Sequence, residues 1–279
     1  MNLSVIIPIY NEEKTITACL TSLAQQTVPF ELIVVDDGST DKTLSVLSKF
    51  QISNFKFQII QEKHQGPGAA RNLGAKNAHG DILVFVDSDM TFAHDFLEKL
   101  TKPIEKGETR GTFTKAEFVS NWDNIWARCW NHNQNIHSDR RIPPDYPETA
   151  PVFRAILSSE FARVGGFTTG VGWTDDWTLS RKLKYQSTAT FAKCYHANPS
   201  TLYEVFTQAK WVGKNEFLTK SPKWIVFNFL RYSIFFSCIY GLFGVVAYGM
   251  LEYLVFKFVY DLGIVAGLTE SILGQHKNK

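Results

Sequence analysis

The stretch Ile82-Leu83-Val84-Phe85-Val86-Asp87-Ser88-Asp89 decides the fold of this chain and marks its first candidate site. Five apolar residues predict a short buried strand, and two carboxylates follow where that strand ends. Open parallel sheets bind ligands at the carboxyl ends of their strands. Asp87 and Asp89 would suit a hard cation there, Mg²⁺ or Mn²⁺, that also binds phosphate oxygens. The alternative is a strand end followed by an ordinary Asx turn.

Three further strands precede this one, and each is followed by a loop and a helix. Apolar runs predict strands over 3–7, 32–35 and 55–60, and helix signals predict helices over 12–26, 40–50 and 66–80. Strands that alternate with helices at this spacing indicate an α/β fold with a mostly parallel, doubly wound sheet. The loops after these strands then share one edge of the sheet with Asp87 and Asp89.

The pattern becomes less regular after the fourth strand. It predicts helices over 94–102, 121–137, 159–164, 173–184 and 201–219, and strands over 111–118 and 152–157. The segment 139–151 is rich in proline and charge, and we expect it to form a surface loop that acts as a lid.

Composition limits the classes of function. With 279 residues, of which 44% are hydrophobic, the chain can bury a full core and carry an appendage. A net charge of +2 argues against a nucleic-acid-binding protein, which needs a clear cationic excess. Its four cysteines lack paired spacing, so a reducing compartment is expected and neither a zinc site nor a disulfide framework is indicated. The run over 3–7 is too short for a signal peptide.

Polar side chains in the loops at this edge suit a nucleotide diphosphate. Carboxylates after the second strand could accept hydrogen bonds from a base or ribose, and a guanidinium at a helix start suits an anionic or uracil-like partner. In chain order the candidates are Pro8, Tyr10 and Glu12, then Asp36 and Asp37, then Arg71 with Asn72, and finally Asp87, Ser88 and Asp89. Each loop alone is a weak signal, whereas four on successive strands are a strong one.

Four stretches in this order resemble the inverting family 2 glycosyltransferases, which have the GT-A nucleotide-sugar fold. They are the runs Val5 to Glu12, Val34 to Asp41, Gly68 to Gly74 and Val86 to Asp89. The resemblance implies that Pro8, Tyr10, Glu12, Asp36, Asp37, Arg71, Asp87 and Ser88 bind the nucleotide, and that Asp87 and Asp89 bind the metal, with Asp89 the more direct ligand. It is dense over roughly the first hundred residues.

The resemblance continues less densely in the second half. The run Asp175-Asp176-Trp177-Thr178-Leu179-Ser180-Arg181 is similar to the family's acidic acceptor motif. It implies that Asp176 is the general base and that Trp173 and Asp175 contact the acceptor. Asp175 stands where Glu is commoner, and Thr178 stands where a further Asp is common. The run Gln208 to Trp211 departs from the motif of processive synthases, which argues against processive polymer synthesis.

Inverting transfer explains why these residue types are needed. A base must remove the proton of the acceptor hydroxyl on one face of the sugar, while a metal stabilises charge on the leaving phosphate on the other. His196 lies where some relatives place a third metal ligand, although a packed loop histidine is the alternative. An ordinary acidic helix start is the alternative for Asp175 and Asp176.

The last part of the chain is strongly apolar. We expect a catalytic domain over 1–223 and a hydrophobic helical segment over 224–279. The run 232–251 has no charge and is just long enough to span a bilayer, and 253–273 is a second candidate. Lysines before the first run predict that the catalytic domain lies on the cytoplasmic side of the cell membrane. A buried hairpin or a dimer interface is the alternative.

These observations favour a membrane-attached, metal-dependent enzyme that uses a nucleotide sugar, with a UDP-sugar expected. Its acceptor would be a saccharide or a lipid-linked molecule. Two alternatives remain open: a soluble oligomeric transferase of the same family, and a nucleotide-sugar-binding protein without transfer activity.

Overall fold

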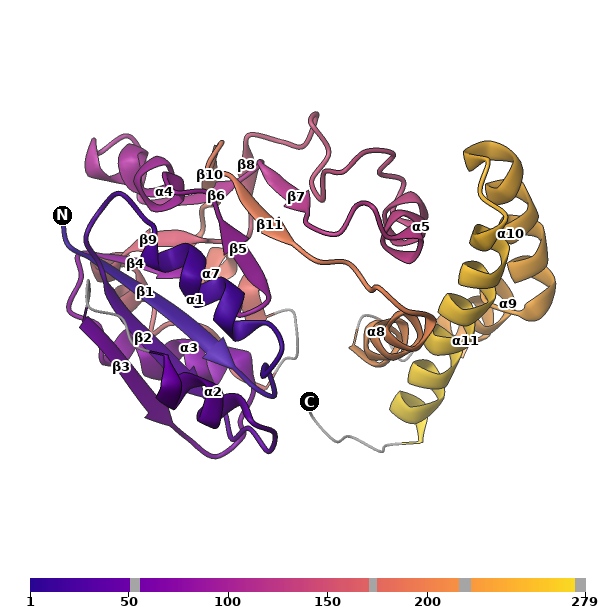
Figure 1. The fold of residues 1–279 in the computed structure, drawn as a ribbon, viewed down its shortest axis with the longest axis horizontal. Coiled ribbons are helices and arrows are strands. Elements are labelled where there is room, and N and C mark those ends of the chain that lie inside the picture. Colours follow the sequence, from indigo (N-terminus) through magenta and orange to yellow (C-terminus); the bar gives the residue numbers. More distant parts are fainter. Residues whose placement is uncertain (51–55, 171–174, 216–221, 274–279) are drawn as a thin grey trace. The chain divides into compact units, whose positions relative to one another are not determined.

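The computed structural model describes residues 1–50, 56–170, 175–215 and 222–273 (Figure 1). Its elements in chain order are β1 (Leu3–Ile9), α1 (Ile16–Ala24), β2 (Glu31–Asp36), α2 (Thr43–Lys49), β3 (Lys56–Gln61), α3 (Pro67–Lys76), β4 (Ile82–Phe85), β5 (Met90–Phe92), α4 (Phe96–Glu105), β6 (Gly111–Thr114), β7 (Glu117–Val119), α5 (Ile125–Asn133), β8 (Thr149–Ala150), β9 (Ala155–Leu157), α6 (Ser158–Arg163), α7 (Asp175–Leu183), β10 (Ser187–Thr190), β11 (Cys194–His196), α8 (Leu202–Asn215), α9 (Pro222–Arg231), α10 (Ile234–Tyr248) and α11 (Glu252–Ile272).

A central sheet organises the first part of the chain. Its strand order is β3-β2-β1-β4-β9-β6-β10-β8. The neighbouring strands β3, β2, β1 and β4 are parallel, as predicted, and Val5 of β1 is in register with Leu32 of β2 and Val84 of β4. In the other half of the sheet, β9 runs antiparallel to both β4 and β6, while β10 is parallel to β6. The predicted α/β fold with a mostly parallel sheet is confirmed.

Both faces of this sheet are covered by helices, because successive side chains on a strand point to opposite faces. Val5 and Ile7 of β1 pack with Leu20 of α1 and Leu100 of α4 in one cluster. Ile6, between them in sequence, packs in a second cluster with apolar residues of α3, α6 and α7. Strands buried on two faces read as continuous apolar runs rather than alternating ones, which explains why the sequence predicted them well.

A small second sheet, with strand order β5-β11-β7, begins directly after Asp89. In it His196 of β11 pairs with Met90 of β5. The single strand predicted over 111–118 is therefore wrong, since β6 and β7 belong to different sheets. The chain bends between them, where the backbone N–H of Ala116 donates to Thr114 Oγ1 at 3.0 Å.

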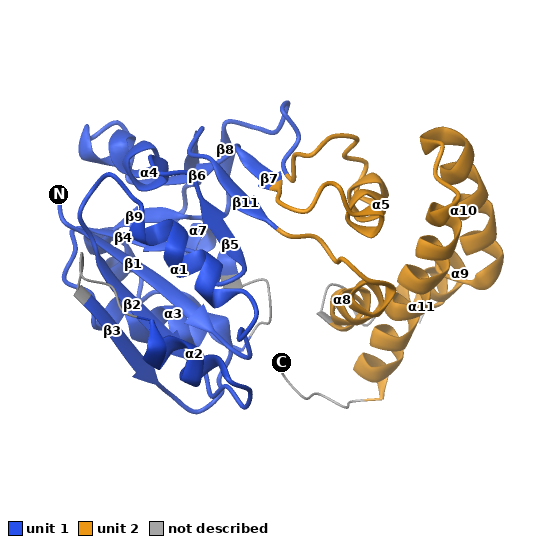
Figure 2. Cartoon of the chain, viewed as in Figure 1, with its two compact units in different colours: residues 1–118, 142–196, 278–279 blue, residues 119–141, 197–277 orange. Residues whose placement is uncertain are grey.

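The chain divides into two compact units (Figure 2). Unit 1 comprises residues 1–118, 142–196 and 278–279, and unit 2 comprises 119–141 and 197–277. The boundary after residue 223 stays a prediction, and the two units group residues 119–141 and 197–223 with the C-terminal helices. The reason is packing: Trp130 of α5 and Ala209 of α8 share an apolar core with Phe256 of α11.

The helices of unit 2 do not include a simple membrane span. Among the described residues no single helix has the length and hydropathy to cross a bilayer, whereas α9 and α10 reach that threshold as a pair bent by 50°. The expected span over 232–251 is not one continuous helix, because α10 begins at Ile234, ends at Tyr248 and has only 15 residues. A helix of that length covers about 22 Å, less than the roughly 30 Å of a hydrocarbon core.

Candidate active site

Asp87, at the end of the fourth strand, lies between two guanidinium groups of unit 1. Its Oδ1 is 2.8 Å from Nη2 of Arg71 on α3, and its Oδ2 is 2.8 Å from Nη1 of Arg154, next to β9. Burial alone would raise the pKa of Asp87, but the charges of Arg154 and Arg71 lower it well below the ordinary range for Asp. Asp87 is therefore held as a carboxylate by two cations.

Arg71 connects this carboxylate to the predicted general base. Its Nη1 lies 2.9 Å from Oδ1 of Asp176 on α7, and the Arg71 side chain is only 8% exposed, compared with 35% for Asp176. A guanidinium presents several donors in a fixed plane, so it can bridge two carboxylates in a way that Lys cannot. The structure thus brings Asp87 and Asp176 to one edge of the sheet, although 89 positions separate them in sequence.

Arg154 continues the connection in the other direction. Its Nη2 is 4.0 Å from Glu117 Oε2, and Glu117 Oε1 is 3.3 Å from Nδ1 of His196. The other ring nitrogen of His196, Nε2, is 2.9 Å from Asp89 Oδ2. We call the seven residues Asp176, Arg71, Asp87, Arg154, Glu117, His196 and Asp89 the charge network.

Two members of the charge network, Asp89 and His196, carry side-chain types that can bind a cation. The side chain of Asp89 is 42% exposed, whereas that of His196, whose Nε2 lies 2.9 Å from Asp89 Oδ2, is 17% exposed. In the described parts of the chain, no group of three or more His, Cys, Asp or Glu side chains could hold a metal by itself. Two protein ligands suit Mg²⁺ or Mn²⁺ bound to a diphosphate, because such ions take their remaining ligands from phosphate and water.

The loop before α7 is fastened to α3. Asn72 donates from Nδ2 to the carbonyl of Phe167 at 3.0 Å and accepts from the Phe167 N–H at 2.9 Å. Gly166 has a φ of +67°, and a Cβ there would collide with Oδ1 of Asn72. The N–H of Thr168 donates to Thr178 Oγ1 at 3.0 Å. Thr178, which departs from the family pattern, therefore helps to hold this loop.

The first two loops are fastened to each other in the same way. Asn11 has a φ of +59°, and its Oδ1 accepts from the N–H of Thr40 at 2.7 Å. The N–H of Glu12 donates to Thr43 Oγ1 at 2.8 Å, and its carboxylate accepts from Thr15 at 2.6 Å. These motif residues therefore build the loop scaffold.

The predicted nucleotide ligands Asp36 and Asp37 are both buried. The carboxylate of Asp36 accepts from the N–H of Ser39 at 3.1 Å. That of Asp37 accepts from the N–H groups of Gln65 at 2.6 Å and Gly66 at 2.8 Å, and it pairs with His64 at 2.9 Å. Their predicted contact with a base or ribose stays a prediction.

The remaining predicted residues are placed as follows. Pro8 lies near the end of β1, in register with Val35 of β2. The ring of Tyr10 stacks on His64 with 4.3 Å between centroids. Ser88 is buried between the two aspartates. Asp175 is the first residue of α7, and Trp173 lies outside the described residues.

Sequence reasoning missed Arg154 and Glu117. Neither belongs to a motif, and each reaches the site through strand pairing that joins distant segments. An Arg and a Glu, each within a predicted strand (152–157 and 111–118), were the available signals, and both are common.

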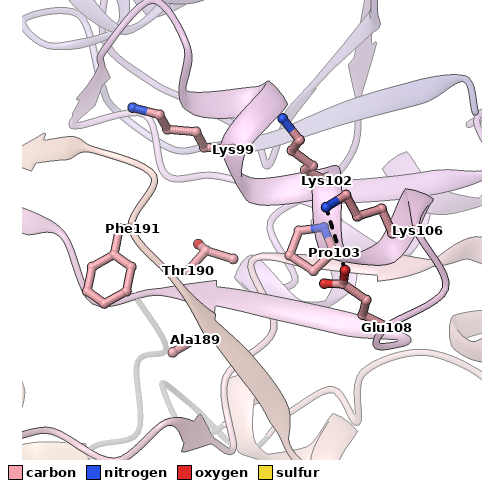
Figure 3. Close-up of a pocket in the computed structure, with 8 residues that line it drawn as sticks. All are labelled: Lys99, Lys102, Pro103, Lys106, Glu108, Ala189, Thr190 and Phe191. Atoms are coloured by element: carbon pink, nitrogen blue, oxygen red, sulfur yellow. Dashed lines mark ion pairs between the residues drawn. The ribbon is translucent and has the colours of Figure 1, made fainter.

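A surface pocket of about 340 Å³ lies elsewhere on unit 1, between α4 and the β10 region (Figure 3). It contains no residue of the charge network. Its three lysines are paired with acidic neighbours: Lys99 with Asp95 at 2.6 Å, Lys102 with Glu98 at 4.0 Å, and Lys106 with Glu108 at 3.7 Å. The acidic partners reduce its positive charge, so the pocket is not a strong anion site.

Several known proteins are similar to this chain in sequence. The poly(ribitol-phosphate) β-N-acetylglucosaminyltransferase TarS of Staphylococcus aureus is 45% identical over 105 residues, which cover 36% of this chain and 18% of TarS. An uncharacterized glycosyltransferase of Haemophilus influenzae is 31% identical over 193 residues, which cover 67% of this chain and 64% of that protein. The match to TarS thus spans less than a fifth of that relative's length.

Solved structures are similar in fold. Residues 1–349 of S. aureus TarS in complex with UDP-GlcNAc give a TM-score of 0.58 at 20% identity, covering 100% of this chain and 93% of that one. A mannosyltransferase of Pyrobaculum calidifontis in complex with GDP-Man and Mn²⁺ gives a TM-score of 0.61 at 18% identity, covering 98% and 88%. These likenesses confirm the predicted GT-A-like fold.

The family itself follows from the sequence model that matches. Residues 4–164 match the family described as glycosyl transferase family 2. This range includes the loops that carry Tyr10, Asp37 and Arg71 as well as both carboxylates after β4. The chain belongs to glycosyl transferase family 2.

Proposed function

We propose that this chain is an inverting glycosyltransferase that moves a sugar from a nucleotide-diphospho-sugar to a hydroxyl acceptor. The observation that carries the proposal is the charge network, which places Asp176 at the same sheet edge as Asp89 and His196. The proposed base and the proposed cation site on the leaving-group side are thereby joined by one continuous set of contacts. Membership of the family supports the same conclusion.

The nucleotide is proposed to bind along the loops after β1, β2 and β3. Tyr10, stacked on His64, offers an aromatic surface for a base. Asp36 and Asp37 lie next to it at the end of β2, as a base or ribose contact requires. We propose a UDP-sugar as donor, which is supported by the similarity of TarS, solved with UDP-GlcNAc.

A divalent cation, Mg²⁺ or Mn²⁺, is proposed to bind at Asp89 and His196. Their oxygen and nitrogen atoms, 2.9 Å apart, suit such an ion, and Glu117 behind the imidazole is typical of histidines that bind metals. The ion would neutralise the charge that develops on the leaving diphosphate. Asp87 faces two arginines instead, so its direct role as a ligand stays a prediction.

Asp176 is proposed to act as the general base. It would take the proton of the acceptor hydroxyl while the acceptor oxygen forms a bond to the anomeric carbon and the bond from that carbon to the phosphate oxygen breaks. The nucleoside diphosphate leaves, and attack from the opposite face inverts the anomeric configuration. Arg71 holds Asp176 ready for this step through the contact at 2.9 Å.

The acceptor is proposed to be a saccharide or a lipid-linked molecule. Asp175, at the start of α7, is adjacent to the base in sequence, which suits a role in placing the acceptor. The same role is proposed for Trp173 from the family resemblance alone.

Attachment to the cell membrane is proposed from the arrangement of α10, and the cytoplasmic side is proposed for unit 1 from the basic residues that precede this helix in sequence. This helix buries its small residues Ser237, Gly241 and Gly244. It exposes large apolar ones, including Phe243 at 68% and Val246 at 84%. Helices that pack in lipid use small residues for contact and turn large ones outward.

One experiment distinguishes binding to lipid from two alternatives, which are a contact between two copies of the chain and an apolar face that neither lipid nor a second copy covers. The full chain should co-sediment with vesicles of anionic and zwitterionic phospholipid. A Phe243→Glu, Val246→Glu double variant should not. Thr269→Glu, on an exposed position of α11, is the control. If vesicles fail to bind and the full chain sediments as a dimer that the double variant loses, the apolar face is a contact between two copies instead. If it remains a monomer without binding vesicles, neither lipid nor a second copy covers the face.

The transferase function is tested by a donor screen. UDP-, GDP- and other nucleotide sugars would be incubated with candidate acceptors and Mn²⁺ or Mg²⁺, with release of nucleoside diphosphate as the readout. Product analysis by NMR should show an anomeric configuration opposite to that of the donor. Binding of a nucleotide sugar without turnover for any acceptor would favour a non-catalytic binding protein.

A further inference from the structure

Glu117 is a buried carboxylate of β7 that faces two cationic or potentially cationic groups. Its side chain is 10% exposed, with Oε1 at 3.3 Å from His196 Nδ1 and Oε2 at 4.0 Å from Arg154 Nη2. No motif marks it, and the proposed mechanism assigns it no proton transfer or contact with substrate. Burying a carboxylate is costly unless it is paired, so these contacts need an explanation.

The second sheet explains how Glu117 reaches His196. In the order β5-β11-β7, the central strand β11 carries His196, with the strand of Glu117 on one side. On the other side β5 begins at Met90, which pairs with His196 and directly follows Asp89. The pairing of β11 in the middle of this sheet therefore places the imidazole beside Glu117, while Asp89, the residue before β5, contacts the imidazole through its other ring nitrogen. Strand pairing fixes the positions of His196 and Glu117 more firmly than loops could.

We propose that Glu117 is a positioning residue that orients His196 toward the divalent cation, an inference that rests on the proposed metal site. Glu117 accepts a hydrogen bond from Nδ1–H, which keeps Nε2, on the side of Asp89, available to the cation. Arg154 pairs with the second oxygen and keeps the carboxylate from turning away. Outer carboxylates of this kind set the tautomer of a ligating histidine and strengthen its binding to metal.

The same contacts link the two halves of the charge network. Arg154 touches both Asp87 and Glu117, so the geometry of the cation site is coupled to the carboxylate that holds Arg71. The charges of Asp87 and Glu117 raise the pKa of Arg154 above its ordinary value despite burial. Substitution of Glu117 should therefore affect mainly the orientation of His196, because Arg154 would still pair with Asp87, its closer partner.

Direct binding of Mn²⁺, measured by electron paramagnetic resonance on the full chain with UDP present, tests the proposal. Glu117→Ala should weaken Mn²⁺ binding by about 10- to 100-fold. Glu117→Gln, whose amide oxygen can still accept from Nδ1, should recover much of it. Glu108→Ala is the control, because Glu108 belongs to an exposed pair with Lys106 in the same unit and should leave Mn²⁺ affinity unchanged.

A second readout does not depend on metal. In ¹⁵N-histidine spectra of the metal-free protein at pH 8, Nδ1 of His196 should carry a proton in the wild type and in Glu117→Gln, whereas in Glu117→Ala the ring proton should reside on Nε2, which faces Asp89. A role in folding alone would lower the melting temperature of Glu117→Ala and leave both the tautomer and the Mn²⁺ affinity of the folded fraction unchanged. That result would overturn the proposal.

Parallel variants separate this inference from the proposed function. If Asp89→Ala and His196→Ala weaken Mn²⁺ binding while Glu117→Ala does not, only the role of Glu117 fails. If none of the three weakens it, the cation site itself is wrong and the inference fails with it. Sugar transfer by the wild-type chain, measured separately, decides whether the transferase function survives in either case.

Discussion

Asp176 and Asp87 both pair with Arg71, but we expect different effects when they are substituted. Loss of Asp176 should lower kcat, and loss of Asp87 should change how stability depends on pH. Asp176→Asn should lower kcat by on the order of 100-fold or more, because the amide cannot take a proton. Donor affinity should change little, because the nucleotide loops lie on other elements. Steady-state kinetics with calorimetry of UDP binding measures both quantities. Asp175→Asn is the comparison and should act more mildly; the reverse order would mean that the base is its neighbour.

The paired carboxylate of Asp87 should contribute to stability in a way that depends on pH. Because Arg154 and Arg71 lower its pKa in the folded state, this contribution is fully present above the ordinary Asp pKa of about 3.9 and is lost as the pH falls toward the lowered value. The difference in unfolding free energy between wild type and Asp87→Asn should therefore be constant from pH 8 to 5 and shrink below about pH 4. Urea denaturation at each pH measures it. A difference that grows toward low pH would contradict the pairing.

At the scale of single residues, the sequence predicted the carboxylates Asp87, Asp89 and Asp176 together with Arg71 and His196, but neither Arg154 nor Glu117. Asp87 and Asp89 follow a buried strand, and Asp176 begins a helix after glycines, so each has a local signal. Arg154 has none, since its position depends on β9 inserting antiparallel between β4 and β6. The position of Glu117 likewise depends on the break between β6 and β7, within a run whose pattern predicts a single strand.

At the scale of elements, the close contact of α3 with β1 decides where Arg71 lies. A Cβ on Gly74 would collide with the buried side chain of Ile6, and it would lie 3.3 Å from Val35. Gly74→Ala should therefore destabilise the fold by about 1–3 kcal/mol, even though Ala favours helices. Thermal or urea unfolding measures the change. Lys76→Ala, on the exposed side of the same helix, is the control, and equal stability of Gly74→Ala and wild type would contradict the contact.

A buried ion pair on α11 is joined to α10 by a hydrogen bond from Ser237, within unit 2. Lys257 Nζ lies 2.6 Å from Asp261 Oδ1, and Ser237 donates to the other oxygen at 2.8 Å. Lys257→Met should destabilise the chain by about 3–5 kcal/mol, because it leaves Asp261 buried without its partner. The double variant Lys257→Met, Asp261→Leu should cost less than the single one. Lys99→Met, from an exposed pair, should cost at most about 1 kcal/mol.

The elements themselves were largely predictable in the first hundred residues. There, continuous apolar strands alternate with helices whose apolar residues recur at helical spacing. Prediction failed where pairing is not local: the second sheet takes its strands β5, β7 and β11 from three separate segments. Short strands of three residues leave too little pattern to detect.

At the scale of the whole molecule, the two units have different surfaces. Unit 1 contains the sheet and the entire charge network, and unit 2 is helical with an exposed apolar face on α9 and α10. Composition predicted that the C-terminal segment is apolar. It did not predict that α5 and α8 belong to the same unit, which they join through core residues such as Trp130 and Ala209. The amphipathic pattern of those helices does not specify which partner they pack against.

Calorimetric titration of UDP, with and without Mn²⁺, tests the central claim that this sheet edge binds a nucleotide diphosphate through a cation. Mn²⁺ should strengthen UDP binding to the wild type and to Asp176→Asn, because the ion compensates repulsion between the diphosphate and Asp89. In Asp89→Ala the effect of Mn²⁺ should be largely lost. Equal UDP affinity in all three proteins, whether or not Mn²⁺ is present, would contradict the account.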